Sequence, residues 1–146
     1  MALRFEDGWY VGDAADDLAE VLLINGADGY PVNEVRHSIC SGCGAAVFEV
    51  HGVWEERVRK RICRSCGDQH YLLDSEDYWD DDSAYISVCT CEEELFNVAV
   101  GYSMYADEVG GIRSVAFVER CTACGRIGSP VEWMLRTGDM GMLDRA

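Results

Sequence analysis

The chain has 146 residues and a formal net charge of −15, from 27 acidic and 12 basic side chains. This charge opposes bulk attraction to nucleic acid and favours a basic protein partner. No apolar run reaches the roughly 18 residues of a membrane span, and residues 1–10 lack the apolar stretch of a signal peptide. We therefore expect a cytoplasmic protein with no membrane association, in which thiols stay reduced.

Residues 1–34 are predicted to contain one capping helix. Asp13 is a good N-cap residue, and Gly26 is predicted to end the helix. Apolar side chains between them recur at helical spacing, which indicates a face packed against a core. An acidic docking helix is the alternative interpretation. The residues on the predicted apolar face are Ala14, Ala15, Leu18, Val21 and Leu22.

Residues 35–73 are predicted to form a first β-rich lobe. Alternation at Val35, His37 and Ile39 indicates a strand that leads into a cysteine pair. Residues 45–51 and 53–62 are predicted to be the two strands of a hairpin, with Gly52 between them. A short strand over residues 71–73 follows.

Residues 74–84 are predicted to be an exposed acidic linker, because six of the nine residues 74–82 are acidic. A second β-rich lobe then covers residues 85–135, with apolar alternation from Phe96 to Met104 and a return strand over residues 112–120. The similar layout of the two lobes indicates a tandem repeat. Residues 136–146 are predicted to be a frayed C-terminal tail.

All eight cysteines lie between residues 40 and 124, as four close pairs. Three pairs have the form Cys-x-x-Cys-Gly, whereas Cys89-Thr90-Cys91 has a single intervening residue. Four thiolates can hold Zn²⁺ in a closed tetrahedral site with bonds of about 2.3 Å. A hairpin between two pairs brings them together at its open end. We assign Cys40, Cys43, Cys63 and Cys66 to one metal site, and Cys89, Cys91, Cys121 and Cys124 to the other.

Paired Cys-x-x-Cys-Gly motifs on either side of a hairpin resemble the zinc ribbon family, here as a tandem pair over about residues 35–135. The resemblance implies a mainly β fold stapled by two structural Zn²⁺ ions, to which this chain adds one N-terminal α-helix. Closed four-thiolate sites have no open coordination position, so we assign no catalytic residues and expect no enzyme activity. Three alternatives use the same cysteines: a cross-braced pairing of the first and third pairs, four disulfides, or iron–sulfur clusters.

The three histidines are interpreted as ordinary strand or surface residues, because each predicted site already has four sulfurs. They are His37, His51 and His70. Of these, His70 follows the second cysteine pair closely and could hydrogen-bond a sulfur atom.

Two charged segments are candidate interaction surfaces. The first combines an aromatic residue with basic neighbours and could stack a base and bind phosphate, although a solvated hairpin face is the favoured interpretation. It consists of Trp54, Arg57, Arg59, Lys60 and Arg61. The second is the acidic segment 74–82 with Tyr78 and Trp79, together with Glu92, Glu93 and Glu94; its exposed aromatic residues could anchor a basic protein.

The tip of the second hairpin carries Ala106-Asp107-Glu108. This tripeptide resembles the tip of transcript-cleavage zinc ribbons of the TFIIS type, in which the two acids help to bind a catalytic Mg²⁺. Tyr105 and Met104 depart from the Ser and Arg of that family.

We expect a non-enzymatic protein–protein interaction module of the inhibitor, immunity or adaptor type, whose acidic surface docks a basic partner. The alternatives are an RNA-polymerase-associated zinc ribbon and a nucleic-acid-binding regulator. We also expect the first lobe to survive loss of the second, because the acidic linker separates them.

Overall fold

The computed structural model describes residues 3–26, 31–53, 55–105, 111–128, 130–133 and 140–146. Within these ranges the chain is mostly antiparallel β-sheet with one α-helix, which confirms the predicted mainly β class. Trp54 and the Ala106-Asp107-Glu108 tip lie outside the described residues. None of the helices in the described ranges has the length and apolar character needed to cross a bilayer.

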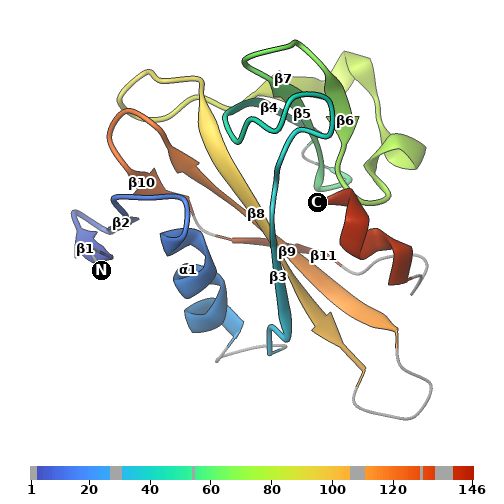
Figure 1. Cartoon of the computed structure of the whole chain (residues 1–146), viewed down its shortest axis with the longest axis horizontal. Coiled ribbons are helices and arrows are strands. Elements are labelled where there is room, and N and C mark those ends of the chain that lie inside the picture. The colour runs from blue at the N-terminus through green and yellow to red at the C-terminus, as the bar shows by residue number, and fades with distance from the viewer. Residues whose placement is uncertain (1–2, 27–30, 54, 106–110, 129, 134–139) are drawn as a thin grey trace.

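The spine of the molecule is a long antiparallel hairpin made of β8 (Phe96–Met104) and β9 (Ile112–Cys121) (Figure 1). Its register runs from Phe96 opposite Cys121 to Met104 opposite Ile112, with an irregularity next to Met104. Eight consecutive residues of β8 are buried, as expected for a strand that is covered on both faces. The hairpin therefore contributes side chains to two hydrophobic cores, one on each of its faces.

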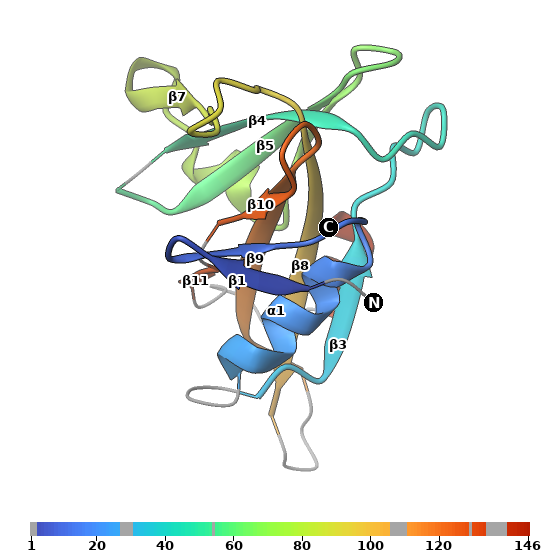
Figure 2. The ribbon, with the colours of Figure 1, turned by 90° about the vertical axis from the view of Figure 1, so that its left-hand side faces the viewer.

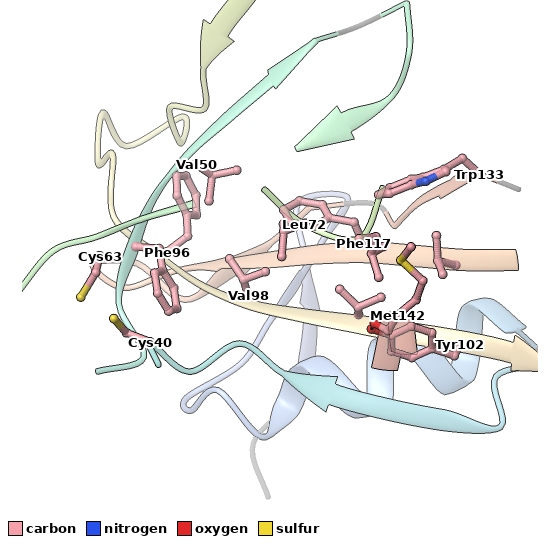
Figure 3. Packing of buried hydrophobic residues seen from close by; sticks show 14 of the residues in the cluster. Cys40, Val50, Cys63, Leu72, Phe96, Val98, Tyr102, Phe117, Trp133 and Met142 are labelled. Atoms are coloured by element: carbon pink, nitrogen blue, oxygen red, sulfur yellow. The ribbon is translucent and has the colours of Figure 1, made fainter. Parts of the chain in front are cut away.

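The larger core lies where the predicted apolar alternation of β8 places it. Val98, Val100 and Tyr102 pack there with Phe117 of β9 and with residues of the first hairpin (Figure 3). Because side chains alternate along a strand, the residues between them face the other side. That side carries Ala99 and forms the smaller core with the helix.

The helix α1 (Asp17–Gly26) ends where the sequence predicts but begins four residues after the predicted N-cap at Asp13. Residues 13–16 form turns instead, and the Asp17 side chain accepts a hydrogen bond from the Ala14 amide at 3.1 Å. Leu18, Val21 and Leu22 are buried as predicted. The helix covers the small side chains of β8 and β9, which supports its interpretation as a packing element.

Two short N-terminal strands were not predicted. β1 (Arg4–Glu6) and β2 (Trp9–Val11) form a hairpin, and β2 pairs with β10 (Arg126–Ile127). β10 in turn pairs with β9, so the N-terminal hairpin extends the main sheet. Figure 2 shows β10 next to this N-terminal hairpin.

The first hairpin consists of β4 (Phe48–Val53) and β5 (Val58–Cys63), with β6 (Gln69–Tyr71) on its outer edge. The predicted turn at Gly52 is wrong, because Gly52 lies within β4 opposite Arg59. A Cβ at Gly52 would come within 2.8 Å of the Tyr85 hydroxyl oxygen. The glycine thus permits a close approach of Tyr85 rather than a turn.

Strands from the two predicted lobes pair with each other in one sheet. β3 (Glu34–His37) pairs with β8 along its whole length, and β7 (Ala84–Ile86) pairs with β4. The two hairpins also meet directly, because Phe48 of β4 is the register partner of Phe96 of β8. Figure 2 shows β4 and β5 running across the upper end of the β8–β9 hairpin.

The acidic segment is partly ordered into the 3-10 helices η1 (Ser75–Tyr78) and η2 (Asp81–Ser83). Asp74 and Ser75 at its start are buried, and the Ser75 hydroxyl oxygen accepts a hydrogen bond from the Arg59 amide at 3.0 Å. The predicted exposed loop is therefore wrong for these two residues. The start of the segment is thus hydrogen-bonded to β5. The acidic residues after Asp74 remain exposed.

The C-terminal segment packs on the larger core. β11 (Val131–Trp133) pairs with β9, and the 3-10 helix η3 (Met140–Arg145) follows. The Tyr102 hydroxyl donates to the Met142 carbonyl oxygen at 2.8 Å, and the Leu73 amide donates to the Arg145 carbonyl oxygen at 3.0 Å. The predicted frayed tail is therefore wrong for residues 140–146.

Candidate metal centres

The eight cysteines gather in the two groups of four that the sequence predicts. Cys40, Cys43, Cys63 and Cys66 form one group, and Cys89, Cys91, Cys121 and Cys124 form the other. In each group all four sulfur atoms lie within 4.8 Å of one another. Figure 3 shows the sulfurs of Cys40 and Cys63 facing each other at one end of the larger core.

The sulfur spacing fits a tetrahedral metal ion. Four sulfurs at about 2.3 Å from one Zn²⁺ lie about 3.8 Å apart. The Cys40 and Cys66 sulfurs lie 3.6 Å apart, and those of Cys43 and Cys63 lie 3.5 Å apart. In the second group Cys89–Cys124 and Cys91–Cys121 are both 3.5 Å apart. Each group could therefore hold one metal ion.

Two of the alternative roles of the cysteines, disulfide bonds and a cross-braced metal site, do not fit this geometry. A disulfide requires about 2.05 Å between its sulfurs, and all eight cysteines are free. Cross-bracing would bring the first and third pairs together, whereas each group combines pairs that are consecutive along the chain.

Three of the four cysteine pairs are closed by the same turn. The amides of Gly44, Gly67 and Gly125 donate to the carbonyl oxygens of Cys40, Cys63 and Cys121, at 2.8, 2.9 and 3.0 Å. The three glycines have φ between 77° and 80°, the left-handed region in which a side chain is disfavoured. This explains the glycine of the Cys-x-x-Cys-Gly pattern.

The Cys89-Thr90-Cys91 pair closes one residue earlier. The Glu92 amide donates to the Cys89 carbonyl oxygen at 2.8 Å, and Glu92 has a φ of 75°. A glutamate thus occupies the left-handed position that glycine occupies in the other three turns. The shorter pair still brings its sulfurs into the second group, so the departure from the family spacing changes the turn and not the grouping.

Backbone amides within these turns point at the sulfurs. Hydrogen bonds from the amides of Cys66 and Ser65 lower the pKa of the Cys63 thiol to about 6, against the effect of its burial. Burial raises the pKa of the Cys121 thiol to about 12, and its contacts with the neighbouring thiols add to this shift. Four thiolates in one group repel each other, so a cation is needed for all four to be ionised together.

The two groups occupy equivalent places on their hairpins. Phe48 lies opposite Cys63 at the open end of the first hairpin, as Phe96 lies opposite Cys121 in the second. The Arg64 amide donates to the Val47 carbonyl oxygen at 3.0 Å, and the Thr122 amide donates to that of Leu95 at 3.1 Å. An equivalent backbone hydrogen bond therefore lies next to each four-cysteine group.

No family model, curated protein or solved structure matches this chain. The resemblance to zinc ribbons accordingly depends on the two four-cysteine groups and on the hairpins that carry them.

The three histidines lie outside both four-cysteine groups. His70 Nε2 hydrogen-bonds the Arg145 carbonyl oxygen at 3.0 Å, so the predicted bond to a sulfur is wrong for this nitrogen. His51 Nε2 pairs with the Glu49 carboxylate at 2.6 Å. These contacts agree with the interpretation of His51 and His70 as strand residues.

Two arginines of the predicted basic surface are buried. Arg59 and Arg61 are each only 4% exposed. The Arg59 guanidinium lies 5.3 Å from the Phe117 ring centroid, and that of Arg61 lies 4.6 Å from the Phe48 ring centroid. Both the phosphate-binding and the solvated-face interpretations are therefore wrong for these two residues.

The aromatic residues of the acidic segment are half-buried rather than exposed. The Trp79 ring packs edge-to-face against the Tyr71 ring, with the two centroids 5.5 Å apart. Lys60 Nζ lies 4.9 Å from the centroid of the Trp79 ring. Trp79 Nε1 also donates to the Asp81 carboxylate at 2.9 Å. These contacts leave the acids, rather than the rings, as the exposed part of the segment.

Glu119 is a buried carboxyl that the sequence analysis did not single out. Burial raises its pKa to about 7, whereas Arg59 and a hydrogen bond with Ser87 act in the opposite direction. Its Oε2 atom is covered and has no hydrogen-bond partner among the described residues. Strand alternation places Glu119 on the Phe117 side of β9, and no local motif distinguishes it from a surface acid.

Proposed function

We propose that the chain is a tandem zinc ribbon that holds two structural Zn²⁺ ions, one in each four-cysteine group. The observation that carries this proposal is that all four sulfurs of each group lie within 4.8 Å of one another, with two sulfur pairs in each group 3.5–3.6 Å apart. That spacing suits a four-thiolate tetrahedron. The equivalent positions of the two groups on their hairpins support a tandem arrangement.

Such ions would be structural because four thiolates complete the tetrahedral coordination of Zn²⁺. A catalytic zinc ion keeps one position open for water or substrate. The binding free energy of the ions would then contribute to folding rather than to chemistry.

Elemental analysis of the purified chain tests the metal proposal. We expect two equivalents of zinc per chain and a colourless protein, whereas an iron–sulfur cluster would absorb visible light. Cys43→Ser and Cys91→Ser should each lower the zinc content to about one equivalent in whatever protein stays folded. A wild-type content below one equivalent would contradict the proposal.

We further propose that the protein is a non-enzymatic interaction module whose acidic surface docks a basic partner. The support is the net charge of −15 and the exposure of the acids after Asp74. Among the described residues, none of the ion pairs uses an acid of segment 74–82. Asp80 and Asp81 accept hydrogen bonds within the segment, but these donors are uncharged and leave the negative charge for a cationic surface. The exposed acids of the segment are Glu76, Asp77, Asp80, Asp81 and Asp82.

Affinity capture with the purified chain, at low and at high salt, tests the docking proposal. We expect a partner of basic isoelectric point that is retained at about 50 mM salt and lost near 500 mM, because salt screens exposed charges. Replacing Asp80, Asp81 and Asp82 with asparagine should weaken capture. Replacing the exposed Asp16, Glu55 and Asp144 with their amides removes the same charge outside this acidic surface and is the matched control. Capture that is insensitive to salt would contradict electrostatic docking.

A further inference from the structure

Arg61 of β5 is a buried cation that the metal sites do not yet explain. The residue is 4% exposed, and none of the ion pairs between described residues includes it. Its guanidinium donates to the carbonyl oxygen of Ala146 at 3.1 Å and to that of Ile39 at 3.4 Å. A buried charge is unfavourable unless an opposite charge lies nearby, and backbone carbonyl oxygens carry no full charge. The side chain therefore requires a counter-charge.

The buried negative groups near Arg61 belong to the first four-cysteine group, the one that begins at Cys40. Burial lowers the pKa of Arg61, and attraction by Cys40, Asp68 and Cys63 opposes this shift. Asp68 is exposed, so solvent screens its charge. Cys40 and Cys63 are buried, and both are members of the first group. Their sulfurs are therefore the counter-charge that solvent screens least.

The local structure holds the guanidinium beside this group. Phe48 is the register partner of Cys63, and the Arg61 guanidinium lies 4.6 Å from the Phe48 ring centroid. The hydrogen bond to the Ile39 carbonyl oxygen reaches the residue directly before Cys40. Arg61 is thus positioned from both strands that lead to the end of the core where Figure 3 shows Cys40 and Cys63.

A bound zinc ion would complete the charge balance at this place. Four thiolates around one Zn²⁺ give a complex with a net charge of about −2. A buried cation next to such a complex is attracted strongly, because little solvent screens the interaction. The attraction also favours the complex, since the same free energy applies to both partners. Arg61 and the proposed ion would therefore stabilise each other.

The second four-cysteine group has no such cation at the equivalent position. Arg61 precedes Cys63 by two residues, whereas Glu119 precedes Cys121 by two. The second group instead has Arg126, whose guanidinium donates to a hydroxyl between two of its cysteines. The two groups therefore use different cations, and loss of Arg61 should act mainly on the first.

Arg59 provides an internal comparison on the same strand. It is as buried as Arg61, and its guanidinium also lies over a phenylalanine ring. Burial lowers the pKa of Arg59, but the opposing attractions come from Tyr85 and Glu119. The two arginines thus share burial and ring contact, and they differ in the negative groups that they face.

We propose that Arg61 is the counter-charge of the zinc ion proposed for the first four-cysteine group, and that this ion is held less tightly when the guanidinium is absent. This inference rests on the proposed zinc sites and adds a residue outside the eight cysteines that supports one of them. Arg61 is a positioning residue rather than a ligand, because it acts on the ion through the charge of Cys40 and Cys63.

Release of zinc from the zinc-loaded full chain, measured for each group separately, tests this role. Excess EDTA removes the metal, N-ethylmaleimide traps the freed thiols, and peptide mass mapping follows Cys66 and Cys124. These two cysteines are both exposed and occupy the same place in their turns. For Arg61→Met we expect Cys66 to react about 10- to 100-fold faster than in the wild type, the usual effect of removing a group that supports metal ligands. The increase at Cys124 should be smaller.

Three further variants separate charge from packing. Arg61→Lys keeps the charge and should return Cys66 close to its wild-type rate. Arg61→Gln keeps a hydrogen-bond donor without the charge and repeats the test if the methionine variant does not fold. Arg59→Met removes an equally buried arginine and should not raise the rate at Cys66 relative to Cys124. Thermal unfolding shows which variants are folded. Equal acceleration of Cys66 and Cys124 in the uncharged Arg61 variants, or no rescue by lysine, would overturn the proposal.

Failure of this role is distinguishable from failure of the zinc sites. If the wild type holds two equivalents of zinc and the uncharged Arg61 variants release them at the wild-type rate, the zinc sites stand and Arg61 is not a counter-charge. If the wild type holds less than one equivalent, the zinc sites fail before any variant is compared, and the role of Arg61 fails with them.

Discussion

At the scale of single residues, Glu92 has the least favourable backbone conformation in the turns of the two four-cysteine groups. Its φ of 75° is the left-handed conformation that Gly44, Gly67 and Gly125 adopt in the other turns. A residue with a side chain pays about 1–2 kcal/mol there, whereas glycine adopts it freely. The chain therefore carries strain at the one turn whose cysteine pair is shortened.

Glu92→Gly should stabilise the protein by about 1 kcal/mol. The relief of the left-handed strain exceeds the extra entropy of glycine in the unfolded chain, which is about 0.5–1 kcal/mol. Urea unfolding monitored by circular dichroism should show a higher midpoint with an unchanged slope. Glu94→Gly removes the same charge from an exposed neighbour and should not stabilise. A lower midpoint for Glu92→Gly would show that its carboxylate matters more than its φ.

The cysteine groups could be predicted from the sequence because the information is local. Two cysteines and a glycine define a turn whose amides aim at sulfur, and a hairpin between two turns closes the site. The burial of Arg59 and Arg61 could not be predicted in this way. Their guanidinium groups pack on Phe117 and Phe48, and the first of these partners comes from β9, far along the chain.

At the scale of elements, α1 packs closely on the β8–β9 hairpin because that face is made of small residues. A Cβ at Gly101 would lie 3.2 Å from Leu22 Cδ2 and 3.1 Å from Val32 Cγ1. Ala99 and Ala116 continue the small-residue surface under the helix. The distance between helix and sheet is thus set by side-chain size.

Gly101→Val should destabilise the protein by about 1–3 kcal/mol, because the added methyl groups overpack the contact with α1. The higher strand propensity of valine offsets only part of this cost. Chemical denaturation of the single variant measures the effect. Adding Val32→Ala removes one of the two obstructing side chains and should recover part of the loss. A Gly101→Val protein as stable as the wild type would show that the helix can move away freely.

Elements with a clear local sequence pattern could be predicted. Short strands that depend on pairing with residues far along the chain could not. Apolar alternation indicated β8 correctly because its core-facing residues recur every second position. β1, β2 and β7 have three residues each and depend on partners elsewhere in the chain. Gly52 was misplaced because glycine marks both turns and close approaches, and only the position of Tyr85 distinguishes them.

At the scale of the whole molecule, the two hairpins are joined along several strands. β3 precedes the first cysteine pair but pairs with β8, whereas β7 precedes the third pair but pairs with β4. The C-terminal segment ties both parts together, because Tyr102 of β8 contacts Met142 while Leu73 contacts Arg145. The sequence alone predicts two lobes that unfold separately. The strand exchange predicts one cooperative unit.

Disruption of the second four-cysteine group should therefore destabilise the first hairpin as well. Cys121→Ser leaves three sulfurs, and the binding free energy of the proposed zinc ion, about 10–16 kcal/mol for a structural site, is comparable with the whole stability of a domain. Hydrogen exchange should show loss of protection at Val50 of β4 together with Val98 of β8. Cys43→Ser, in the first centre, should expose the same two amides. Retained protection at Val50 in Cys121→Ser, with Val98 exchanging freely, would show instead that the hairpins fold independently despite their shared sheet.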